Sequence, residues 1–153
     1  MIEMLLGFLA DIFSTLFSHF TSKHGEQSET RQRYEDLRRE IAAALTMNSC
    51  YFHNPIDIAQ TRDHRLPENY AEGSRQLREL ASQLRALTET MPEKVKDMPI
   101  TKMDMYEASK YLIGLSNSFT TPYGMAQTSE EYRAVREFEA EIRKLLNISE
   151  VRG

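Results

Sequence analysis

The stretch "YEDLRREIAAALTMNSCYFHNP", residues 34–55, carries the helical pattern that decides the fold of this chain. Its apolar positions recur at alternating steps of three and four residues, which places them on one face of a helix. Asn48 is the one polar member of this stripe, which consists of Tyr34, Leu37, Ile41, Leu45, Asn48 and Phe52. Because Pro55 disfavours a helical conformation before it, the pattern predicts an amphipathic helix that ends before "HNP".

Three further helices are predicted downstream. The second has an apolar face and ends at Met91 and Pro92; its face consists of Tyr70, Leu77, Leu80, Leu84 and Leu87. Thr101 with Asp104, and Thr128 with Glu131, have the spacing of helix-start capping boxes. The fourth helix has a face made of Tyr132, Val135, Phe138, Ile142, Leu145 and Leu146.

The connections between these helices are predicted to be loops. "PIDIAQTRDHRLPEN", residues 55–69, contains two prolines and several turn-forming residues, and no stretch alternates as a strand would. The expected fold class is therefore all-α, with an N-terminal hydrophobic helix followed by a four-helix bundle. The expected divisions are a membrane helix over 1–22, a hinge over 23–29, a cytosolic bundle over 30–147 and a tail over 148–153.

The chain begins with "MIEMLLGFLADIFSTLFSHF", residues 1–20, an apolar run interrupted by carboxylates. As a helix it would reach about 30 Å, the thickness of the hydrocarbon core of a bilayer. Its polar residues share one side of the helix, and this stripe comprises Glu3, Gly7, Asp11, Ser14 and Ser18. In a membrane span such a stripe would point toward other helices or water, so these residues are expected to line a pore. An interfacial helix and a helix packed in a soluble core are the two alternatives.

Charge and cysteine content set further limits. Four arginines follow the apolar run, and this asymmetry predicts an N-terminus outside the cytoplasm and a cytoplasmic bundle; they are Arg31, Arg33, Arg38 and Arg39. A lone cysteine, Cys50, forms no intramolecular disulfide, which suits a reducing compartment. The net charge of −4 argues against broad nucleic-acid binding.

The sequence offers little that indicates a cofactor or a small-molecule substrate. It contains no phosphate-binding glycine loop and no hydrolase nucleophile elbow. The imidazoles and carboxylates of His24, His53, His64, Asp57 and Asp63 lack metal-ligand spacing, so they are interpreted as solvated residues. No metal and no cofactor is expected.

"NSCYFH" places Asn48 and His53 five residues apart near the end of the first bundle helix. This spacing resembles that of HEPN proteins, small helical bundles whose ribonuclease members carry an arginine, often a following polar residue, and then a histidine. Met47 stands where that family has the arginine. Asn48 and His53 are therefore the candidate catalytic residues, but a non-enzymatic function is favoured because the cation that would stabilise a phosphoryl transition state is missing.

The wider pattern joins residues 34–55 with "LRELASQLRAL" and "YLIGLSNSF". It resembles HEPN-like, membrane-anchored helical proteins of bacterial antiviral systems, including the accessory pore proteins of type VI CRISPR loci. The resemblance implies defence by membrane permeabilisation, with an RNA or a CRISPR effector as a further partner.

We therefore expect a membrane-anchored oligomer that contacts lipid and forms a pore or perturbs the inner membrane. A lone polar-striped helix encloses no water, so this function requires several copies of the chain in a ring. Two alternatives stay open: a divergent HEPN RNA-binding or ribonuclease module, and a soluble helical oligomeric adaptor.

Overall fold

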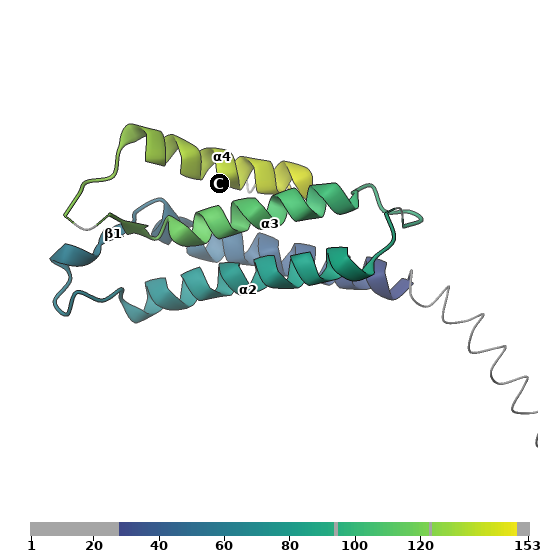
Figure 1. Cartoon of the computed structure of the whole chain (residues 1–153), viewed down its shortest axis with the longest axis horizontal. Helices are drawn as coiled ribbons and strands as arrows, with labels where there is room; N and C mark the ends of the chain where they lie inside the picture. Colours follow the sequence, from purple (N-terminus) through teal and green to yellow (C-terminus); the bar gives the residue numbers. More distant parts are fainter. Residues whose placement is uncertain (1–27, 94, 123, 150–153) are drawn as a thin grey trace, which may run out of the picture.

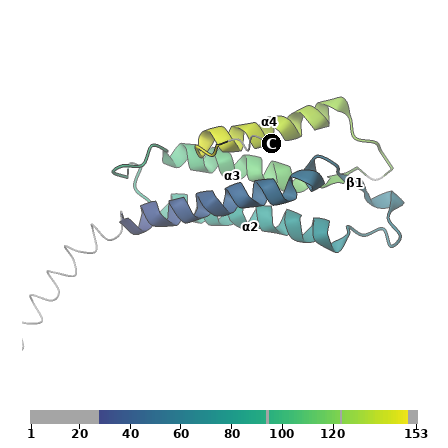
Figure 2. The ribbon, with the colours of Figure 1, turned by 180° about the vertical axis from the view of Figure 1, so that it is seen from behind.

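The computed structural model describes residues 28–93, 95–122 and 124–149. Four helices account for most of this part: residues 28–52, α2 (Glu68–Thr90), α3 (Lys102–Asn117) and α4 (Ser129–Leu145). Successive helices run in opposite directions along the bundle (Figure 1). Seen from behind, the 28–52 helix lies between α2 and α4 (Figure 2). The predicted helical bundle is confirmed.

One hydrophobic core joins the four helices. It is built by the periodic apolar positions of each helix; its largest fully buried side chains are Tyr34, Phe52, Phe119, Ile41, Leu45, Leu77, Leu84, Met105, Leu112, Leu115, Ile142 and Leu146. Burying a side chain of this size contributes about 1.5–3 kcal/mol. One expectation for α4 is wrong: Tyr132 is 45% exposed, whereas Val135 is buried. Tyr132 is exposed because it lies at the edge of the apolar face of α4.

The helix boundaries follow the start and stop signals of the sequence. The hydroxyl oxygens of Thr101 and Thr128 accept hydrogen bonds from the backbone N–H groups of Asp104 and Glu131, whose carboxylates accept in return from the N-cap backbone. Both predicted capping boxes are therefore confirmed. The C-cap of α2 is Met91, followed by Pro92, as the sequence predicts.

The predicted loop of residues 55–69 contains short regular elements that the sequence does not indicate. β1 (Ile56–Asp57) pairs in parallel with β2 (Thr120–Thr121), and the 3-10 helix η1 (Ile58–Gln60) follows β1. The two strands tie the connections after the 28–52 helix and after α3 together at one end of the bundle. A two-residue strand is too short to produce a detectable alternation of polar and apolar residues.

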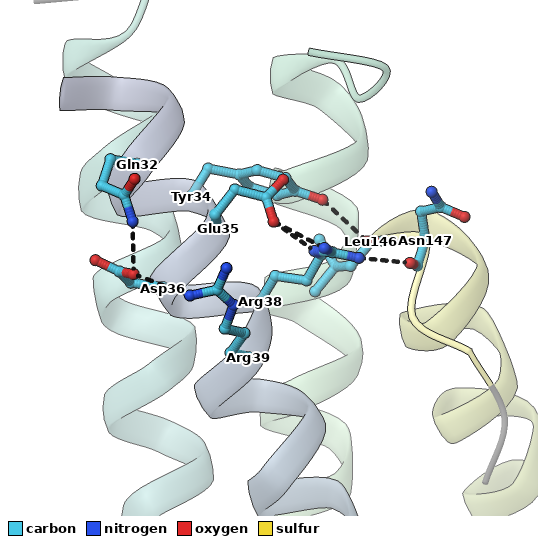
Figure 3. Close-up of polar contacts among 8 residues, drawn as sticks. All are labelled: Gln32, Tyr34, Glu35, Asp36, Arg38, Arg39, Leu146 and Asn147. Atoms are coloured by element: carbon cyan, nitrogen blue, oxygen red, sulfur yellow. Dashed lines mark hydrogen bonds and ion pairs between the residues drawn. The ribbon is translucent and has the colours of Figure 1, made fainter. Parts of the chain in front are cut away.

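The C-terminal turn of α4 is fastened to the beginning of the 28–52 helix (Figure 3). The buried Tyr34 hydroxyl donates a hydrogen bond to the Leu146 carbonyl oxygen at 2.9 Å, and Arg38 donates to the Asn147 carbonyl oxygen at 3.0 Å. Arg38 also pairs with Glu35. These bonds satisfy carbonyl groups that the end of α4 leaves without helical partners.

The structure describes only the end of the segment that the sequence assigned to the hinge, residues 23–29. Residues 28 and 29, assigned to the hinge, are already helical. The proposed membrane helix over 1–22 lies outside the described residues. Among the helices of the described part, none combines the length and apolar character that a membrane crossing requires.

Candidate functional site

A polar groove lies between the 28–52 helix and α4. It encloses a cavity of about 500 Å³, lined by Thr46, Ser49, His53, Arg136, Glu139, Ala140 and Arg143. The first three of these come from the 28–52 helix and its end, and the other four come from α4. The lining therefore combines an imidazole, a carboxylate, two guanidinium groups and two hydroxyls.

Glu139 connects the charged groups of this groove. Its Oε2 lies 2.9 Å from His53 Nε2, and its Oε1 lies 3.4 Å from Arg143 Nη2. The exposed fractions of the three side chains are 33% for His53, 20% for Glu139 and 9% for Arg143. An imidazole that bonds a carboxylate through Nε2 carries its proton on that nitrogen, so the neutral form leaves Nδ1 as a base.

The local sequence explains how each segment presents its groups to this groove. His53 directly follows the last helical residue, Phe52, whose ring packs 4.8 Å from the imidazole between centroids. On α4, Arg136, Glu139 and Arg143 follow one another at steps of three and four residues and so share one face. The buried Arg143 is also held by the Ser149 carbonyl oxygen, to which its Nη1 donates at 3.1 Å.

This arrangement has the chemistry of an oxyanion site with an acid–base group. Arg136 is exposed at the groove and forms none of the ion pairs found among the described residues. A guanidinium group presents parallel N–H donors that match the oxygens of a phosphate or a carboxylate. The groove therefore provides a cation beside an imidazole whose orientation a carboxylate fixes.

The structure separates the two residues that the sequence singled out together. Asn48 is buried, and its Nδ2 donates to the Ala44 carbonyl oxygen at 2.8 Å and to Gln76 Oε1 at 3.0 Å. It lines a different cavity, on the α2 side of the 28–52 helix. Five residues on a helix correspond to a rotation of about 140°, so Asn48 and His53 point toward different neighbours.

Two further sets of residues were considered from the sequence, a pore-lining stripe and a group of possible metal ligands. Glu3, Gly7, Asp11, Ser14 and Ser18, expected to line a pore, lie outside the described residues, as does His24. Within the described ranges, no group of three or more His, Cys, Asp or Glu side chains is arranged to hold a metal ion.

Sequence reasoning missed Arg136, Glu139 and Arg143. A signal was available, because these residues form a charged stripe along one edge of a strongly amphipathic helix. What the stripe faces is decided by packing, since His53 lies 86 positions earlier in the chain than Glu139.

Comparisons of the chain with protein-family models, with curated proteins and with solved structures found no match.

Proposed function

We propose that this chain acts as a membrane-anchored oligomer, with residues 1–22 in the bilayer and the helical bundle as its assembling body. The observation that carries this proposal is that the described residues build a hydrophobic core among themselves, from Tyr34 to Ile148. A body with its own core and capped helices leaves the apolar first segment available for insertion into lipid.

The sequence of this segment supports a pore or a local perturbation of the membrane. Its carboxylates and small polar residues share one helix face, and a charge facing lipid costs about 2.5–3.5 kcal/mol on insertion scales. Several copies in a ring would shelter Asp11 from lipid and surround a wet lumen. Through the resemblance to accessory proteins of antiviral systems, the consequence would be permeabilisation of the inner membrane.

Ion flux through lipid vesicles tests the pore. Asp11→Asn should insert normally but lose cation preference, because a ring of carboxylates favours cations. Asp11→Leu should suppress conduction by removing water from the lumen, whereas the control Leu9→Asp, on the opposite face, should impair insertion. Equal flux and selectivity in the wild type and both Asp11 variants would remove the case for a pore.

Fractionation of lysed cells tests the anchor and the soluble-adaptor alternative. The full chain should sediment with membranes and be released by detergent. A full chain that stays dispersed in the supernatant after high-speed centrifugation would favour the soluble oligomeric adaptor instead.

A second candidate function is RNA binding or cleavage, favoured by the groove around His53. His53 Nδ1 has the character of a general base for a ribose 2′-hydroxyl, whose oxygen would attack the adjacent phosphorus as the 5′-oxygen leaves with a proton from water. Arg136 supplies the cation that the sequence motif lacks at Met47. The negative net charge of the chain weighs against an extended nucleic-acid surface.

An assay of metal-independent RNA cleavage by the detergent-purified full chain separates the two candidates. If the chain acts by assembly, no cleavage is expected, and His53→Ala has none to remove. Cleavage that is lost in His53→Ala and in Arg136→Ala but retained in the control His64→Ala, an exposed loop substitution, would favour the ribonuclease.

A further inference from the structure

A groove between the 28–52 helix and α2 is rich in carboxylates. Two adjoining cavities, of about 490 and 300 Å³, share Gln76 and Glu79 in their linings. Their lining residues include three glutamates and one cation: Glu40, Glu72, Glu79 and Arg75. We call this surface the acidic groove.

The other side of α2, where it packs on α3, presents cations. Arg78 donates through Nε to Ser116 Oγ at 3.3 Å and through Nη2 to Asn117 Oδ1 at 3.0 Å. Arg85, one heptad later, repeats the contact by donating through Nε to Ser109 Oγ at 3.0 Å. Lys110 lies on the same surface, and we call Arg78, Arg85 and Lys110 the basic seam.

The arginines of the basic seam differ from those of the 28–52 helix in their partners. Arg38 and Arg39 pair with carboxylates one helical turn earlier on their own helix. None of the ion pairs found within the described ranges involves Arg78 or Arg85, whose recorded hydrogen bonds go to neutral oxygens. Glu79 follows Arg78 directly on α2 but lines the acidic groove. Glu89 is exposed one turn after Arg85, and Glu107 on α3 pairs with Lys110.

Each surface also exposes a large apolar side chain. Met47, 69% exposed, lines the acidic groove. Tyr106 is exposed on the basic seam, with the Arg85 guanidinium carbon 5.5 Å and the Lys110 ammonium 4.9 Å from its ring centroid. Met103 is exposed three residues before Tyr106, on the same face of α3. Tyrosine, methionine and arginine are enriched in the cores of protein interfaces.

We propose that the acidic groove of one copy of this chain binds the basic seam of a second copy. Charge complementarity identifies the occupant, because the two surfaces carry opposite charge and each adds an exposed apolar side chain. When each copy uses its acidic groove on one neighbour and its basic seam on another, the contact is head-to-tail, and such contacts form a ring where the rotation between copies closes. This inference rests on the proposed oligomeric function and names the surfaces that would assemble it.

Charge reversal on the full chain in detergent provides the test. One variant combines Glu72→Lys with Glu79→Lys, and the other combines Arg78→Glu with Arg85→Glu. Each variant alone should require at least about tenfold more protein for half-assembly, because like charges then face each other. An equal mixture should assemble again, since each reversed surface then meets a complementary one. A chain with all four substitutions should also assemble.

One further variant is a control for charge change elsewhere, and a second tests the basic seam by a milder change. Arg133→Glu changes the charge of an exposed α4 residue and should leave assembly unchanged. Lys110→Glu is a milder change to the basic seam, because its ammonium pairs with Glu107 on the same helix, and it should weaken assembly too. If the double arginine variant loses its helical circular dichroism signal, the result for Lys110→Glu is decisive in its place.

Light scattering after gel filtration supplies the measurement. Assembly that weakens with added salt, fails in each variant and returns in the mixture supports the proposal. A monomeric wild-type chain, or an oligomer that the reversals leave unchanged, would overturn it. Assembly that responds as expected without ion flux through vesicles would contradict the pore alone, so the two proposals fail separately.

Discussion

At the scale of single residues, Tyr34 combines burial with a hydrogen bond that closes the bundle. Its hydroxyl donates to the Leu146 carbonyl oxygen, 112 positions later in the chain. Burial raises the pKa of Tyr34 above its ordinary value; the Arg38 charge lowers this pKa and the Glu35 charge raises it. Tyr34 therefore remains protonated in the folded chain at pH values where it ionises in the unfolded chain.

This difference predicts a loss of stability in alkali. Because the pKa of Tyr34 is raised on folding, its contribution is complete below the unfolded pKa of about 10 and is lost as pH rises above that value. Tyr34→Phe should cost about 1 kcal/mol at neutral pH and should make the free energy of unfolding fall less steeply above pH 10. Denaturant unfolding at a series of pH values measures both effects.

Tyr132→Phe is the matched control, because this tyrosine is largely exposed. It should leave the free energy of unfolding and its alkaline dependence close to those of the wild type. An alkaline limb of equal slope in the wild type and in Tyr34→Phe would contradict the role assigned to Tyr34.

At the scale of helical elements, the approach of α2 to the 28–52 helix depends on Gly73. A Cβ at this position would lie 2.2 Å from Asn48 Oδ1 and 3.0 Å from Phe119 Cε2. Asn48 has little room to yield, since it is buried and its amide nitrogen is held by Ala44 and Gln76. The glycine and the polar residue of the first apolar stripe therefore fit together.

We expect Gly73→Ala to destabilise the bundle by about 1–3 kcal/mol through overpacking, although alanine is the better helix former. In the Asn48→Ala background the same substitution should be neutral or stabilising, by up to about 1 kcal/mol, because the colliding amide oxygen is gone. A double-mutant cycle of thermal or denaturant unfolding measures this change of sign. Additive effects of the two substitutions would show that Gly73 and Asn48 are not coupled.

At the scale of the whole molecule, the described bundle should fold without the first segment. Deleting residues 1–22 removes none of the described core residues, so the shortened chain should retain its helical circular dichroism signal and melt cooperatively. It should also lose its association with membranes. A shortened chain without cooperative melting would indicate that the first segment belongs to the core of the domain.

The sequence by itself determined the helices of the described bundle. The stripe from Tyr34 to Phe52, the capping boxes at Thr101 and Thr128 and the stop at Pro92 are local signals, and a helix forms from contacts within one or two turns. The two-residue strands left no such signal, because their pairing joins residues more than sixty positions apart.

Only the tertiary structure decided which polar groups meet. The sequence joined Asn48 with His53, but the helix directs the first toward α2 and the second toward α4. Glu139 contacts His53, and Arg136 lines the same cavity, because α4 packs on the 28–52 helix. Arg78 and Arg85 meet serines because α3 packs on α2. Local patterns fix the face that a helix buries, whereas its neighbours are fixed by packing between distant segments.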